Sequence, residues 1–117
     1  MSVEEDMRAH ILEVLDFIAD EGAQRAYQVR APGISVGNEL FNMWDDCYPP
    51  QESVRLLFTV PQLNALARFN ATLEEVADMT PDEVPPLDDF VHTDEWRRLN
   101  QAARRALKSV MSAETQT

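Results

Sequence analysis

The chain has 117 residues, 44% hydrophobic and 26% charged, so it is long enough to bury one core and too apolar to be intrinsically disordered. We expect a single domain over residues 1–117, with residues 112–117 as a frayed tail. The formal net charge of −11 makes nucleic acid a poor direct partner.

The first predicted helix covers about residues 3–20. Its apolar side chains recur at helical spacing, and its acidic side chains gather on the opposite arc. Gly22 is the expected stop, although residues 23–27 are helix formers that either extend this helix or begin another. The apolar set is Met7, Ile11, Val14, Leu15 and Ile18, and the acidic set is Asp6, Glu13, Asp16 and Asp20.

The middle of the chain is marked by proline. The pair Pro32–Gly33 predicts a turn, after which Ser35 or Asn38 is the expected N-cap of a second helix. That helix ends before Pro49–Pro50, because proline cannot donate the backbone hydrogen bond that a helix interior needs. Residues 52–58 fit a short strand or a helical turn, and we favour helix or irregular structure because one isolated strand cannot complete a sheet.

The second half of the chain begins with a capping box, Thr59-x-x-Gln62, which predicts a helix over about residues 60–78. Residues 87–92 predict a further helical turn, and a last long helix opens at Thr93. About four useful helical segments therefore predict an all-α fold, a small bundle or orthogonal array of about four to five helices. The residues expected to be buried are Ile11, Leu15, Leu66, Phe69 and Trp96.

Charge is unevenly distributed along the chain. Residues 1–95 contain 20 acidic and 5 basic side chains, whereas residues 96–117 contain 5 basic and 1 acidic. In the last predicted helix the basic side chains form a stripe opposite the apolar arc. We interpret the stripe as a solvated face, because the acidic remainder would repel nucleic acid or an anionic membrane. The stripe consists of Arg97, Arg98, Arg104, Arg105 and Lys108.

The segment Trp44–Tyr48 is the densest cluster of reactive side chains, with two carboxylates beside a thiol and a phenol. Adjacent carboxylates raise the pKa of a thiol, and Asp45 and Asp46 point about 100° apart on a helix. We therefore predict that Cys47 is structural and that the chain has no catalytic, metal-binding or cofactor-binding residues. An enzyme that combines this cluster with a histidine brought close by folding is the alternative.

The location is predicted to be cytoplasmic. No apolar stretch is long enough to span a bilayer, and the acidic start does not resemble a secretory signal. A single cysteine cannot form an internal disulfide, which fits a reducing compartment. Arginine outnumbers lysine nine to one, as is typical of GC-rich bacterial genomes.

These patterns favour a small, acidic, non-enzymatic bacterial protein that binds another protein, most simply a basic one. An inhibitor of the immunity, antitoxin or anti-repressor type is one concrete form, by analogy of size and charge. A second alternative is a self-associating homo-oligomer, in which the acidic first helix of one copy meets the basic last helix of another. The candidate partner-binding residues are Asp16, Asp20, Trp44, Asp45, Asp46 and Tyr48.

Overall fold

The structure, a computed structural model, describes residues 3–115, which form seven α-helices and no strand. The all-α prediction is confirmed. The expected number of helices is too low, because the single-turn helices α4 and α6 add to five helices of ten residues or more. The helices are α1 (Val3–Ala19), α2 (Glu21–Arg30), α3 (Val36–Cys47), α4 (Glu52–Arg55), α5 (Val60–Met79), α6 (Leu87–Phe90) and α7 (Asp94–Thr115).

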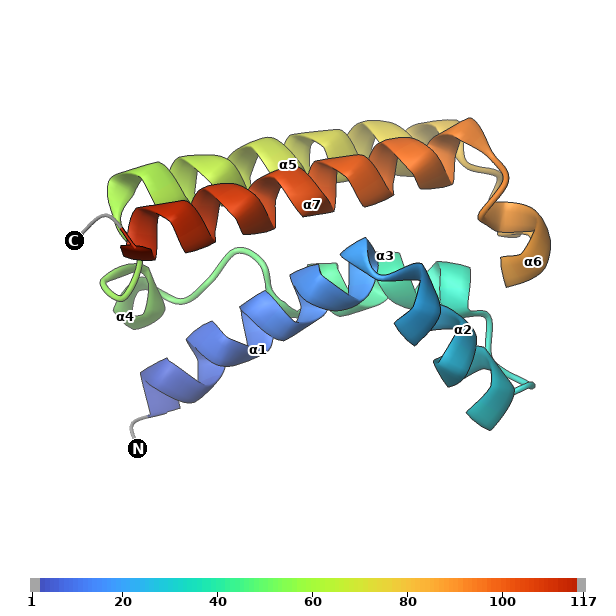
Figure 1. The fold of residues 1–117 in the computed structure, drawn as a ribbon, viewed down its shortest axis with the longest axis horizontal. Coiled ribbons are helices and arrows are strands. Elements are labelled where there is room, and N and C mark those ends of the chain that lie inside the picture. The colour runs from blue at the N-terminus through green and yellow to red at the C-terminus, as the bar shows by residue number, and fades with distance from the viewer. Residues whose placement is uncertain (1–2, 116–117) are drawn as a thin grey trace.

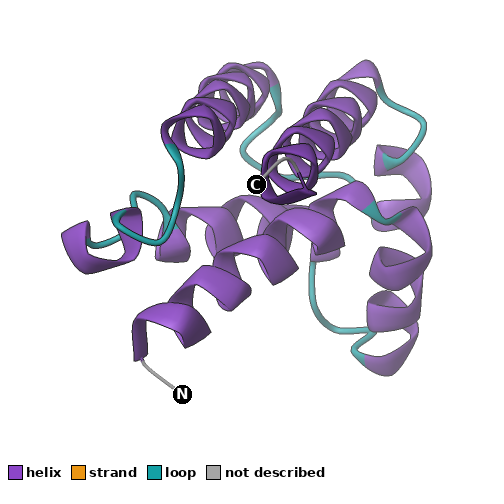
Figure 2. Ribbon diagram, turned by 60° about the vertical axis from the view of Figure 1, so that its left-hand side comes forward, coloured by secondary structure: helices purple, strands orange, loops and turns teal. Residues whose placement is uncertain are grey.

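The helices are arranged in two layers. Helices α5 and α7 lie side by side and antiparallel, above α1 and α3 (Figure 1). Figure 2 looks nearly along this pair and shows the second layer crossing beneath it. Helix α7 contacts both α5 and α1, and α1 in turn contacts α3. Helix α7 therefore makes the most extensive contact between the two layers.

The first helix ends earlier than the glycine suggested. Helix α1 stops at Ala19, and Gly22 lies inside the first turn of α2. Asp20 separates the two helices in an extended conformation, and its Oδ1 accepts a hydrogen bond from the backbone amide of Ala23 at 3.1 Å. An aspartate N-cap begins the new helix, so of the two predicted alternatives the chain starts a second helix.

The last carbonyl groups of α1 are satisfied by side chains from later in the chain. The buried Gln24 of α2 donates from Nε2 to the carbonyls of Phe17 and Ile18, both at 3.0 Å. The buried Asn100 of α7 donates to the carbonyl of Ile18 at 3.3 Å and to the next one at 3.0 Å. Gln24 Oε1 also accepts from Trp96 Nε1 at 3.0 Å. These bonds replace the intrahelical partners that a helix end lacks.

Side-chain caps fix the starts of α3, α5 and α7 as expected. Thr59 Oγ1 accepts from the amide of Gln62 at 3.2 Å, and Gln62 Oε1 accepts from the amide of Thr59 at 2.8 Å. The buried Gln62 also donates to the carbonyl of Val110 at 3.2 Å, which ties the start of α5 to the end of α7. Ser35 caps α3, and Thr93 accepts from an amide in the first turn of α7.

The core lies between the two layers and includes the indole of Trp44. This ring packs edge-on against Phe69 of α5, with ring centroids 4.7 Å apart, and stacks against Tyr48 at 5.0 Å. Its Nε1 donates to Asn70 Oδ1 at 3.0 Å, so no polar atom of the indole is left unpaired. The residues predicted to be buried are all buried: Ile11, Leu15, Leu66, Phe69 and Trp96.

The last helix continues into the predicted frayed tail. Helix α7 remains helical through Thr115, whereas fraying was expected from residue 112. Residues 116–117 of that predicted tail lie outside the described residues. None of the helices formed by residues 3–115 combines the length and the apolar character that crossing a bilayer requires.

Candidate functional site

A hollow of about 340 Å³ lies between the first half of α1 and the end of α3. Asp6 and His10 line it from α1, and Asp46 lines it from the end of α3. Apolar side chains, among them Met7 and Pro49, complete the lining. No lysine or arginine of the described residues lines this space, and we call it the acidic hollow.

The thiol of Cys47 lies on the wall of the acidic hollow and is half-buried. Burial, together with the nearby charges of Asp46 and Asp45, raises its pKa to about 11. Its Sγ donates to the carbonyl of Trp44 at 3.5 Å. A pKa this high favours the protonated thiol at neutral pH, whereas the thiolate is the nucleophilic form.

The segment Trp44–Tyr48 has only part of its surface available to a partner. Asp45 and Asp46 are exposed, and Tyr48 is half-buried. Trp44 has no exposed surface at all, so its ring cannot contact a docked protein. The sequence predicted Trp44 both as a core residue, because of its apolar spacing, and as a candidate contact residue. Its burial places it in the core.

The two candidate aspartates of the first helix lie away from the acidic hollow. Asp16 is exposed on α1, ten residues beyond Asp6 and therefore about 15 Å further along the helix axis. Asp20 is exposed but is occupied as the N-cap of α2. Sequence reasoning missed Asp6 and His10 as site residues, although their i, i+4 spacing puts them on one face of α1.

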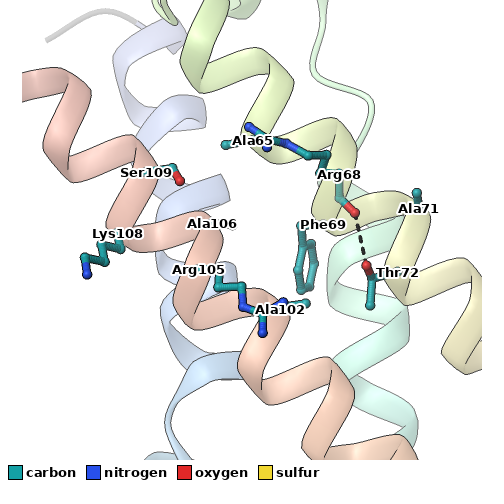
Figure 3. A pocket seen from close by; sticks show the side chains of 10 residues that line it. All are labelled: Ala65, Arg68, Phe69, Ala71, Thr72, Ala102, Arg105, Ala106, Lys108 and Ser109. Atoms are coloured by element: carbon teal, nitrogen blue, oxygen red, sulfur yellow. Dashed lines mark hydrogen bonds between the residues drawn. The ribbon is translucent and has the colours of Figure 1, made fainter.

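A second hollow, about 530 Å³ in volume, runs between α5 and α7 on the outer side of the upper layer (Figure 3). Figure 3 shows the ring of Phe69 standing between the two helices. Each helix contributes side chains at i, i+3, i+4 and i+7, which is the spacing of one helix face. These residues are Ala65, Arg68, Phe69 and Thr72 of α5, and Ala102, Arg105, Ala106 and Ser109 of α7.

The charged side chains of this second hollow are all basic: Arg68, Arg105 and Lys108. Within residues 3–115 none of the three makes an ion pair, although Arg98 pairs with Glu75 at 2.9 Å further along the same helices. We call this hollow the basic groove. The predicted cationic stripe therefore divides into a paired part and an unpaired part, and Arg68 was missed because it belongs to another helix.

The described part of the chain contains no group of three or more His, Cys, Asp or Glu side chains that could hold a metal ion. No protein-family model, curated protein or solved structure matches the chain.

Proposed function

We propose that this protein is a small, cytoplasmic, non-enzymatic binding module that engages a basic partner protein through the acidic hollow. The observation that carries the proposal is the composition of that hollow. Asp6 and Asp46 come from helices far apart in sequence and line one space with an apolar floor. Among the described residues no lysine or arginine neutralises them there.

The methylene chain and the charged head of a partner's lysine or arginine would both fit such a hollow. Its methylene groups would pack against apolar walls such as Met7 and Ile11, and its charged head would reach Asp6 or Asp46. A carboxylate that accepts from a cation in a partly desolvated site makes a shorter and stronger hydrogen bond than a neutral pair. The hollow would thus recognise one basic side chain at the centre of a larger interface.

The exposed carboxylates around the hollow would act at longer range. Asp45 lies next to Asp46 at the end of α3, and Asp16 lies further along α1. With a net charge of −11, the chain attracts a basic protein before contact is made, and this raises the association rate. An inhibitor of a basic protein, of the immunity, antitoxin or anti-repressor type, is the concrete form that we propose.

A hydrolytic enzyme is the second candidate, because Cys47, His10 and Asp46 line the same hollow. A thiol, an imidazole and a carboxylate are the residue types of a cysteine nucleophile with its base and orienting acid. The raised pKa of the Cys47 thiol supports the binding module instead, because catalysis would require a lowered one.

The proposal is tested by capture and by rate measurements on two charge-matched variants. In the first, Asp6→Asn and Asp46→Asn neutralise the hollow; in the control, Asp82→Asn and Asp89→Asn neutralise exposed carboxylates that line neither hollow. Immobilised wild-type protein should capture a basic protein from the source cells, identified by mass spectrometry, and the control should capture it too. The hollow variant should no longer capture this protein.

The purified partner then provides the kinetic test. Its association rate should fall steeply as the Debye length shortens from roughly 30 Å at 0.01 M salt to about 8 Å at 0.15 M. An association rate that is flat over this range would contradict the electrostatic part of the proposal. Equal losses in the two variants would show that net charge, and not the hollow, determines binding.

A further inference from the structure

The part of the α5/α7 pair around the basic groove has an unusual composition for a solvated face. Residues 60–73 of α5 and 96–113 of α7 contain six basic side chains and no acidic one. The solvent face of a surface helix normally carries charges of both signs. On α5 the exposed positions over this stretch include Asn64, Ala67 and Ala71, which are small and uncharged.

Small side chains on two adjacent helices leave room for a third helix. Ala71, Ala102 and Ser109 line the basic groove, and the buried Ala65 and Ala106 form its floor with the ring of Phe69 (Figure 3). Helix axes approach to about 8 Å when small residues lie at the contact. The groove follows two turns of each helix, so its direction and width suit an α-helix that lies between α5 and α7.

The charges around the groove specify the chemistry of that helix. Arg68 lies on the α5 side, and Arg105 and Lys108 lie on the α7 side, so cations flank the apolar floor on both rims. All three are exposed and make no ion pair within the described residues. A complementary helix has an apolar stripe with carboxylates along both of its edges.

We propose that the basic groove is a second docking site, which receives an acidic amphipathic helix of a partner protein. This site is separate from the acidic hollow and takes a ligand of the opposite charge. The proposal does not rest on the function proposed for the acidic hollow, so either can fail without the other.

Two other occupants fit the groove less well. A second copy of the chain offers α1 as its long acidic helix, but the apolar side chains of α1, such as Ile11 and Leu15, are already buried beneath α7 and α3. Nucleic acid in the groove would meet only the three cations that line it, on a chain of net charge −11. A partner helix that brings its own apolar stripe is therefore the occupant to which we commit.

The experiment uses a fluorescent synthetic helix as its probe: a leucine stripe with glutamates along both edges. A second peptide carries lysine at every glutamate position. We expect the glutamate peptide to bind saturably in fluorescence anisotropy, at least about tenfold more tightly than the lysine peptide. Its affinity should fall as salt increases.

Two variants of equal net charge locate the binding site. Arg105→Glu with Lys108→Glu reverses the α7 rim, and Arg30→Glu with Arg55→Glu reverses exposed arginines that line neither the groove nor the acidic hollow. The rim variant should bind the glutamate peptide at least about tenfold more weakly, while the control should stay within about threefold of wild type. Arg68→Glu tests the opposite rim, and thermal melts show whether each variant is folded.

Several outcomes would overturn the docking site. If both double variants lose affinity equally, the peptide senses only net charge. If the two peptides bind alike, or the glutamate peptide does not bind to the folded wild type, the groove does not select an acidic helix. If monomeric dodecanoate binds at the groove and the glutamate peptide does not, the occupant is a small anionic amphiphile and the helix assignment is wrong.

Discussion

The acidic hollow and the basic groove differ in what forms their walls. The groove has a floor of core residues: Phe69 is 2% exposed, and Ala65 and Ala106 are also buried. In the acidic hollow Ile11 is buried, whereas Cys47 is half-buried. The groove is therefore fixed by the packing that holds the protein together, while the hollow lies at the edge of that packing. Substitutions should affect stability much more at the groove than at the hollow.

One core residue lies between the two regions. Trp44 packs against Phe69, which forms the floor of the groove, and it stacks on Tyr48, which follows Cys47 of the hollow. Packed rings transmit small displacements because protein interiors have few voids. The groove and the hollow thus differ in how far each is part of the core. The loss of stability on substitution in the floor of the groove or the wall of the hollow measures this difference.

The largest expected effect is at the groove floor. Phe69→Ala should lower the free energy of unfolding by about 3–5 kcal/mol, because it creates a cavity beside Trp44. Cys47→Ala removes one half-buried atom and should cost about 1 kcal/mol or less. Urea unfolding of the two variants measures both values. Comparable losses would show that the hollow is as deeply built into the core as the groove.

The next effect concerns the reactivity of Cys47. A pKa of about 11 instead of the ordinary 9.0 leaves about a hundredfold less thiolate at pH 7, so iodoacetamide should label the native protein about a hundredfold more slowly than the unfolded chain. The labelling rate should rise about tenfold per pH unit up to pH 11. Rapid labelling at pH 7 would favour the enzyme candidate.

The same shift has a consequence for stability. The native state prefers the protonated thiol, so its contribution is fully present below pH 9 and is lost as the pH rises toward 11. Stability that is flat from pH 8 to 11 in wild type and Cys47→Ala alike would show that the thiol has the same pKa in the native and unfolded states.

The smallest effect separates two exposed aspartates, Asp16 and Asp20. Asp20→Ala should lower stability by about 1 kcal/mol, because Asp20 caps α2 through the amide of Ala23. Asp16→Ala should change stability by less than about 0.5 kcal/mol, because its carboxylate is exposed. Thermal or chemical melts of the pair are sufficient. Equal values would mean that the cap contributes nothing measurable.

The helices were predictable wherever local chemistry decides them. The capping box at Thr59 and Gln62 and the cap at Thr93 are complete within a few residues, so sequence alone located both helix starts. The break between α1 and α2 was predicted two residues too late. Gly22 suits the end of a helix, and Asp20 suits the N-cap of a new one. The capping hydrogen bond of Asp20 sets the position of the break.

The two hollows could not be predicted, because each joins distant segments. Asp6 and Asp46 come together only when α1 crosses α3, and Arg68 joins Arg105 only when α5 packs against α7. Periodicity identifies the face of a helix on which each residue lies, but not which other helix packs against that face. The position of Trp44 in the middle of a helical apolar stripe was the available signal that its ring belongs to the core.

The hydrogen bonds at the end of α1 also bear on how the chain folds. Asn100 donates to carbonyls that lie 82 and 81 residues earlier, and Trp96 reaches Gln24 across 72 residues. Contacts of such long sequence separation form only after most of the chain has been brought together. Until α7 arrives, the carbonyl of Ala19 lacks its donors from Asn100 and Arg104, and the last turn of α1 can fray. We therefore expect α1, α2 and α7 to become ordered in one cooperative step, and no N-terminal fragment that lacks α7 to hold its native form.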